Sequence, residues 1–201
     1  MSRTVDLERR GALLERVANY VLKHGLAELS LRPLADAVDT SPRMLLYHFG
    51  SKEEMVTAVL REIRERQLAL FDRLRRDNLT SPAAVCKAVW TYMSDRRSAS
   101  MLKLFFETYA LALRNPQAFP GFLEGAVEDW LCFLAEPLCS EGATPKRART
   151  IATIILATYR GFMLDLAATG DRARIGRALD VWAESMHPLH SNGDGTDAES
   201  A

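Results

Sequence analysis

Apolar residues recur three or four positions apart along almost the whole of this 201-residue chain, the spacing of α-helices with one buried face. No segment convincingly alternates apolar and polar residues over the length of a β-strand. With 48% hydrophobic and 26% charged residues, the chain has enough apolar surface for a packed core. We therefore predict an all-α protein of about nine helices.

Several helix starts are marked by a hydroxyl residue followed by proline. A hydroxyl at the N-cap accepts a hydrogen bond from a free N–H, and proline at the first helical position lacks an N–H that would stay unpaired. These pairs are Ser41-Pro42, Ser81-Pro82 and Thr144-Pro145. Ser51 and Glu54 have the spacing of a capping box, Ser30 and Asp171 are further N-cap candidates, and Gly25 suits the positive φ that follows a helix end. The predicted helices span residues 6–24, 31–38, 42–48, 52–77, 82–96, 98–114, 118–140, 145–169 and 171–187.

The two shortest predicted helices, 31–38 and 42–48, are joined by a tight turn. This is the arrangement of a helix-turn-helix unit, whose second helix enters the major groove of DNA with its N-terminal residues toward the base edges. The formal net charge of the chain is zero, which argues against a surface covered in basic charge. Residues 1–52 nevertheless hold eight basic and six acidic residues, and a local basic patch is sufficient for DNA binding.

The residues around this unit closely resemble the N-terminal signature of the TetR family. The resemblance is carried by Leu29-Ser30-Leu31-Arg32-Pro33-Leu34-Ala35 and by Leu45-Leu46-Tyr47-His48-Phe49-Gly50-Ser51-Lys52-Glu53-Glu54-Met55. Asp39, Met44 and Leu46 depart from the pattern, where the family usually carries glycine, threonine and tyrosine. We expect Leu46 to take over packing in the core.

This resemblance implies a one-component transcriptional regulator, usually a repressor, that binds an inverted-repeat operator in double-stranded DNA as a homodimer. A small apolar or amphipathic effector, which the sequence does not identify, would release it. We expect residues 1–51 to form a three-helix DNA-binding head and residues 52–188 a helical effector-binding and dimerisation body. Residues 189–201 are small and polar, so we expect a disordered tail.

Candidate DNA contacts follow from the chemistry of single side chains. Arg43 can pair with a guanine edge and Met44 can contact a thymine methyl group. Tyr47 and His48 can donate hydrogen bonds to phosphate oxygens, which fix register without reading sequence. The full set is Arg32, Thr40, Ser41, Pro42, Arg43, Met44, Tyr47, His48 and Lys52. The alternative is a solvated surface charge for Arg43 and Lys52, and a core or interface position for His48.

Residues 101–111 are almost continuously apolar, as expected of a helix that is buried on most sides or lines a cavity. The candidate effector-pocket residues are Trp90, Met93, Phe105, Phe106, Glu107, Tyr109, Trp130 and Phe133. Simple core packing is the alternative for each of them. A carboxylate in so apolar a stretch needs a partner. We therefore expect Glu107 to bind an effector, a basic side chain or the backbone of an adjacent helix.

The last two predicted helices carry apolar stripes suited to self-association. Two such helices from each subunit would form the four-helix dimer interface that the family uses, and Ala157 and Gly161 allow close approach. The candidate interface residues are Ile151, Ile154, Ile155, Thr158, Phe162, Ile175, Leu179, Trp182 and Met186. Part of each stripe must instead face the core of its own chain.

Other classes of function find little support in the sequence. No nucleophile elbow, phosphate-binding glycine loop or zinc-ligand spacing is present, so we expect neither an enzyme nor a cofactor. Cys86, Cys132 and Cys139 lack C-x-x-C spacing and suit free thiols in a reducing cytoplasm. We do not expect His187 and His190 to bind a metal. No signal peptide or apolar stretch of about 18 residues indicates a membrane, so we expect a cytoplasmic protein.

One further alternative remains open from the sequence alone. It is an all-helical ligand-binding or adaptor protein whose head does not bind DNA, and the apolar residues Met44 and Leu46 favour it. The polar side chains of Arg43, Tyr47 and Lys52 argue against it, because such groups are better suited to contacts with DNA than to a protein core.

Overall fold

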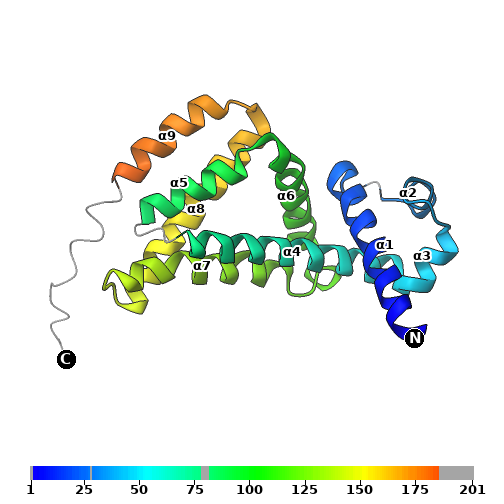
Figure 1. The fold of residues 1–201 in the computed structure, drawn as a ribbon. Helices are drawn as coiled ribbons and strands as arrows, with labels where there is room; N and C mark the ends of the chain where they lie inside the picture. The colour runs from blue at the N-terminus through cyan, green and yellow to red at the C-terminus, as the bar shows by residue number, and fades with distance from the viewer. Residues whose placement is uncertain (1, 28, 78–81, 186–201) are drawn as a thin grey trace. The chain divides into compact units, whose positions relative to one another are not determined.

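The computed structural model describes residues 2–27, 29–77 and 82–185, and within these ranges every element is a helix (Figure 1). The α-helices are α1 (Ser2–His24), α2 (Leu31–Ala37), α3 (Pro42–Phe49), α4 (Lys52–Arg76), α5 (Pro82–Met93), α6 (Ala99–Arg114), α7 (Phe122–Ser140), α8 (Pro145–Thr169) and α9 (Arg172–Ser185). Two short 3₁₀-helices are η1 (Arg96–Ser98) and η2 (Pro116–Ala118). The all-α prediction is confirmed.

The helix boundaries differ from the predicted ones at a few places. The first helix begins at Ser2 rather than near residue 6. The helix predicted over 82–96 ends at Met93, and η1 takes up the following residues. The helix predicted from 118 begins only at Phe122, because Gly121 has a φ of 73° and breaks the helical path. Ser81 and the predicted tail 189–201 lie outside the described residues.

The chain divides into two compact units. The first unit comprises the described residues of Met1–Phe71 and Ala99–Ala126, and the second those of Asp72–Ser98 and Val127–Ala201. The first unit thus contains α6 as well as the helix-turn-helix. The predicted domain boundary at residue 51 stays a prediction.

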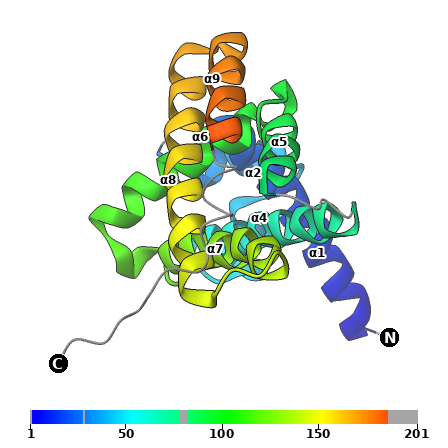
Figure 2. The same cartoon turned by 90° about the vertical axis from the view of Figure 1, so that its left-hand side faces the viewer.

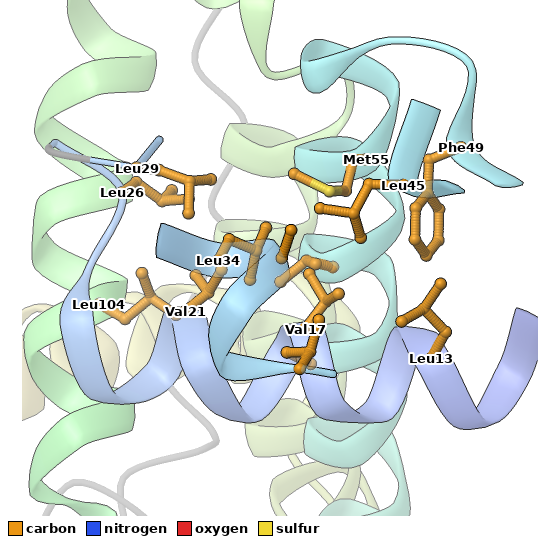
Figure 3. Close-up of a cluster of buried hydrophobic side chains, with 14 residues drawn as sticks. Leu13, Val17, Val21, Leu26, Leu29, Leu34, Leu45, Phe49, Met55 and Leu104 are labelled. Carbon is orange, nitrogen blue, oxygen red and sulfur yellow. The ribbon is translucent and has the colours of Figure 1, made fainter. Parts of the chain in front are cut away.

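The core of the first unit gathers side chains from five helices (Figure 3). Val17 and Val21 of α1 are fully buried, as are Leu34 of α2 and Leu45 of α3. Leu104 reaches the same cluster from α6. The core around the helix-turn-helix therefore also includes a helix that begins 50 residues after α3 ends.

In the second unit, α9 lies alongside both α5 and α8 (Figure 2). The turn between α8 and α9 is built from local polar bonds. Gly170 ends α8 in the left-handed region with a φ of 67°, and Asp171 caps α9 by accepting a hydrogen bond from the Arg174 amide at 3.0 Å. The Arg174 guanidinium also donates two bonds to Asp165, at 2.7 and 3.0 Å, which lower the pKa of that carboxyl.

Cys86 is enclosed within the second unit, whereas Cys132 and Cys139 are exposed on α7, and all three are free thiols. The Tyr159 hydroxyl donates a hydrogen bond to the Cys86 carbonyl oxygen. Burial raises the pKa of the Cys86 thiol to about 12. It also raises the pKa of Tyr159, so both groups stay neutral near pH 7.

The thiols should therefore differ in reactivity, because the thiolate is the reactive form. At pH 8, a colorimetric thiol reagent should modify two cysteines per native chain and all three after unfolding in denaturant. The variant Cys86→Ala should give two in both states. Rapid modification of all three thiols in the native wild-type protein would show that Cys86 is accessible.

Candidate nucleic-acid interface

The recognition helix α3 is buried along one edge only. Leu45 and Phe49 are its buried residues, with 0% and 6% of their surfaces exposed. With about 100° of rotation per residue in an α-helix, the exposed residues Leu46, Arg43, Tyr47 and Met44 follow one another around the opposite side in that order. Together they form an arc of about 160°, which we call the recognition arc.

The polar groups of the recognition arc lie at its centre and the apolar ones at its flanks. Arg43 and Tyr47 are one turn apart, and 70% of the Tyr47 surface is exposed. Met44 and Leu46, at opposite edges of the arc, are 40% and 41% exposed. The prediction that Leu46 packs in the core is wrong, because Leu45 and Phe49 already occupy the buried edge and Leu46 falls on the other side.

The start of α3 is fixed by its turn and its cap. Asp39 has a φ of 50°, the left-handed conformation for which glycine is preferred and which aspartate tolerates better than most residues. The Thr40 amide donates a hydrogen bond to the Ala35 carbonyl at 3.0 Å. The Ser41 hydroxyl accepts one from the Met44 amide at 3.2 Å, which confirms the predicted N-cap. The N–H groups at this helix start favour a nearby anion such as phosphate.

A capping box begins α4, as predicted. The Ser51 amide donates to the Glu54 carboxylate at 2.9 Å, and the Glu54 amide donates to the Ser51 hydroxyl at 3.0 Å. Gly50 has a φ of 84°, and a Cβ there would overlap a Glu54 carboxylate oxygen. This compact junction places the exposed Lys52 at the first position of α4, close in sequence to the end of α3.

Arg10 holds the other end of α3, which the sequence analysis missed. Its Nε donates a hydrogen bond to the His48 carbonyl oxygen at 3.1 Å, and its guanidinium lies 5.4 Å from the centre of the Phe49 ring. His48 itself is half-buried, with its ring edge-on to Tyr47 at 5.1 Å. No local sequence signal identifies Arg10, because its partners His48 and Phe49 lie 38 or more residues away.

The remaining predicted DNA contacts lie before and after the residues of the recognition arc in the sequence. Arg32 is exposed on α2, whereas Thr40 and Pro42 are half-buried at the turn. The structure therefore brings Thr40, Ser41, Pro42, Arg43, Met44, Tyr47 and His48 into the turn and α3, with Arg32 and Lys52 on the flanking helices. Their contacts with DNA stay predictions.

Glu107 on α6 binds the backbone of the connection after α1. Its carboxylate accepts hydrogen bonds from the Leu26 amide at 3.0 and 3.1 Å and from the Ala27 amide at 2.6 Å. The sequence left an effector, a basic side chain or a neighbouring backbone open as partners of Glu107, and in the structure its partner is the backbone. Successive N–H groups that converge after a left-handed residue form an anion-binding nest.

Gly25 makes this contact possible. Its φ is 79°, as the sequence predicted for the end of the first helix, and a Cβ there would lie 2.7 Å from a Glu107 carboxylate oxygen. We call the contact between Glu107 and the amides of Leu26 and Ala27 the carboxylate clamp. Together with Leu104, it joins α6 to the helix-turn-helix by polar and apolar contacts.

The candidate effector residues fall into two groups. In the first unit, Phe105 lies 5.3 Å from Phe106 and 5.7 Å from Tyr109 between ring centres, and Phe122 of α7 joins them at 6.1 Å from Phe105. These four aromatic side chains are half-buried. The sequence analysis missed Phe122, since its role depends on contact with a distant helix.

The other four candidates lie in the second unit. Trp90, Met93 and Trp130 are half-buried, whereas only 3% of the Phe133 surface is exposed. The Arg75 guanidinium lies 5.5 Å from the centre of the Phe133 ring. This burial assigns Phe133 to core packing, the alternative considered from the sequence.

The candidate dimer residues separate into a buried and an exposed set. Ile151, Ile155, Ile175 and Leu179 are at most 2% exposed within a single chain. A partner would therefore have no surface of these four to cover, and they belong to the core of their own chain. Ile154 is 46% exposed, while Thr158, Phe162 and Trp182 are half-buried. Met186 lies outside the described residues, as do His187 and His190.

Comparisons with known proteins agree with this geometry. A family model described as "Bacterial regulatory proteins, tetR family" matches residues 18–59, which include α2 and α3. The HTH-type transcriptional repressor KstR2 of Mycobacterium tuberculosis is 43% identical over 53 residues, 26% of this chain and 26% of that protein. The chain therefore matches about a quarter of the length of this curated relative.

Solved structures resemble the fold over most of its length. A transcriptional regulator from Rhodococcus sp. Rha1 is 20% identical, with a TM-score of 0.74 over 89% of this chain and 96% of that one. The multidrug binding protein EbrR in complex with imidazole is 23% identical, with a TM-score of 0.60 over 96% and 93%. A second structure of EbrR contains proflavin.

Removal of the carboxylate clamp should loosen the connection after α1. In Glu107→Ala, the amides of Leu26 and Ala27 lose their acceptor, so their hydrogen exchange should accelerate. The free energy of unfolding should fall by roughly 1–2 kcal/mol, the range for hydrogen bonds to a charged group that is partly exposed. Glu107→Gln keeps one side-chain acceptor and should show a smaller effect. Unchanged exchange in Glu107→Ala would contradict the clamp.

Proposed function

We propose that the chain is a transcriptional repressor of the TetR family of bacterial regulatory proteins that binds an inverted-repeat operator as a homodimer. Binding of a small apolar or amphipathic effector releases it from DNA. The observation that carries this proposal is the recognition arc, an exposed helix face with Arg43 and Tyr47 at its centre, beside a capped helix start. The family model covers residues 18–59, which include this helix face, and the repressor KstR2 is similar to the chain over 53 residues.

The chemistry of the recognition arc and its surroundings suits both kinds of DNA contact. Arg43 presents a fork of N–H donors that matches the O6 and N7 acceptors of guanine. Tyr47, the amides at the start of α3 and Lys52 can each contact phosphate oxygens, which position the protein without reading sequence. A protein that binds operators in this way acts where the bacterial chromosome lies, in the cytoplasm.

An exposed seam on α8 supports the homodimer. Its members are Thr150, Ile154, Ala157, Gly161, Leu164 and Ala168, all exposed and uncharged, at alternating steps of four and three residues. This is the spacing of helices that pack along their length. A Cβ added at Gly161 would meet nothing within 4 Å, so the seam is open there.

The composition of α8 fits the same interpretation. By length and composition α8 is the one helix among the described ranges that could cross a membrane, yet only 33% of its apolar window is buried within the chain. A second copy covering the seam would account for these uncovered apolar residues. A twofold dimer presents two recognition helices and therefore requires an inverted repeat.

Half-buried aromatic side chains support the effector-binding role. Phe105, Phe106, Tyr109 and Phe122 cluster in the first unit, and Trp90 and Trp130 are half-buried in the second. Apolar pockets with few polar groups bind apolar ligands, and EbrR, which shares the fold, has been solved with imidazole and with proflavin.

The carboxylate clamp supplies a route from the effector to the head. Glu107 lies between Phe106 and Thr108 on α6, so a ligand that shifts this helix would act directly on the connection between α1 and α2. We also expect effector binding to shift α4 and so to disfavour the spacing of the two DNA-binding heads. Coupling of this kind is typically worth about 1–3 kcal/mol between two sites.

The DNA-binding proposal can be tested by selection from randomised duplex DNA at stated salt. The wild-type protein should enrich an inverted repeat. Arg43→Ala should relax the preference at one base position of each half-site, at a cost of roughly 1–3 kcal/mol. Lys52→Ala should weaken binding to all sequences and reduce the slope of log affinity against log salt by about 1. A folded, ligand-free wild-type protein that enriches no sequence would refute the proposal.

The dimer proposal can be tested with a charge placed in the seam. Ala157→Arg should convert the dimer into a monomer, because the interface would have to bury an unpaired charge, and analytical ultracentrifugation would measure the change. Ala99→Arg places the same charge at an exposed alanine of α6 and should leave the dimer intact. A dimer that persists in Ala157→Arg would show that another face of the chain associates.

A further inference from the structure

We propose that the recognition arc reads the C5-methyl groups of two thymines in each half-site, one against Met44 and one against Leu46, on either side of the base contacted by Arg43. The inference rests on the proposed function and names which chemical groups of the operator are recognised. It arises from the exposure of Leu46, which the sequence pattern had assigned to the core.

The first argument is the position of the two apolar side chains. Met44 and Leu46 are 40% and 41% exposed and lie at opposite edges of the recognition arc. A helix that enters the major groove with Arg43 toward its floor would cover both edges. Single exposed apolar residues are common on protein surfaces, but these two would become buried whenever the arc contacts a duplex.

The second argument is the set of groups that the major groove offers to such side chains. Every base edge there carries hydrogen-bonding groups, and only thymine adds a methyl group, at C5. A methionine or leucine laid against an amino group or a carbonyl oxygen would remove water from it without replacing the lost hydrogen bond, which is unfavourable. A thymine methyl has no such cost.

The third argument is what the recognition arc lacks. The Arg43 guanidinium has five donors and no acceptor, and Tyr47 offers a single hydroxyl. The arc holds no carboxylate or amide that could pair with the amino groups of adenine or cytosine. Arg43 and Tyr47 can donate to purine N7, guanine O6 or thymine O4, whereas the C5-methyl group is the feature by which Met44 and Leu46 can distinguish thymine.

The experiment replaces thymine by deoxyuridine, which removes only the methyl group, at each position of the selected operator in turn. For the wild-type protein, two positions per half-site should each lose about fourfold in affinity, the size expected for one methyl group removed from an apolar contact. Deoxyuridine in the spacer between half-sites should have no effect.

Variants then assign each methyl group to a side chain. Met44→Ala should remove the sensitivity to deoxyuridine at one of the two positions and keep it at the other, and Leu46→Ala should do the reverse. Leu113→Ala, which truncates a leucine that is 62% exposed on α6, should keep both sensitivities. Circular dichroism would check that the variants are folded. The deoxyuridine measurements on the wild-type protein test the inference without any variant.

Three results would overturn the inference while leaving the proposed function intact. They are selected half-sites without thymine, equal affinity for thymine and deoxyuridine operators at every position, and an equal loss for both operators in Met44→Ala and Leu46→Ala. The last result would mean that the two side chains contact the sugar-phosphate backbone. Failure to enrich any sequence would instead refute the proposed function, and the inference with it.

Discussion

Burial of a single edge of α3, through Leu45 and Phe49, determines how the rest of the first unit is arranged. Two buried side chains are little for an eight-residue helix, so both of its ends are held by other contacts. Ser41 caps its start, and Arg10 binds the carbonyl of His48 near its end. Since the buried edge fixes the rotation of the helix, it also decides which four side chains form the recognition arc.

The helix-turn-helix depends in turn on α6, which begins 50 residues after α3 ends. Leu104 enters its core, and Glu107 accepts hydrogen bonds from the amides after α1. Gly25 has the backbone conformation and the small size that this contact requires. The same helix carries Phe105, Phe106 and Tyr109, so the residues proposed to sense an effector and those that support the DNA-binding helices share one rigid element.

Features set by local sequence were predictable, and features set by contacts between distant residues were not. The helix positions, the caps at Ser41, Thr144 and Asp171, and the positive φ of Gly25 and Asp39 follow from neighbouring residues, and the structure has them. Ser30, also expected to cap a helix, occupies the N-cap position without a side-chain hydrogen bond. Tertiary packing decides the role of Arg10, the exposure of Leu46 and the burial of four candidate dimer residues on α8 and α9. The spacing of apolar residues in the sequence does not predict these features.

Whether α3 occupies the major groove can be measured most directly by methylation of guanine N7, which faces that groove. In a complex of the protein with its selected operator, we expect dimethyl sulfate to leave at least one guanine N7 unmethylated in each half-site, and Arg43→Ala to restore its methylation. Unhindered methylation of every guanine in a saturated complex of the wild-type protein would contradict a recognition helix in the major groove.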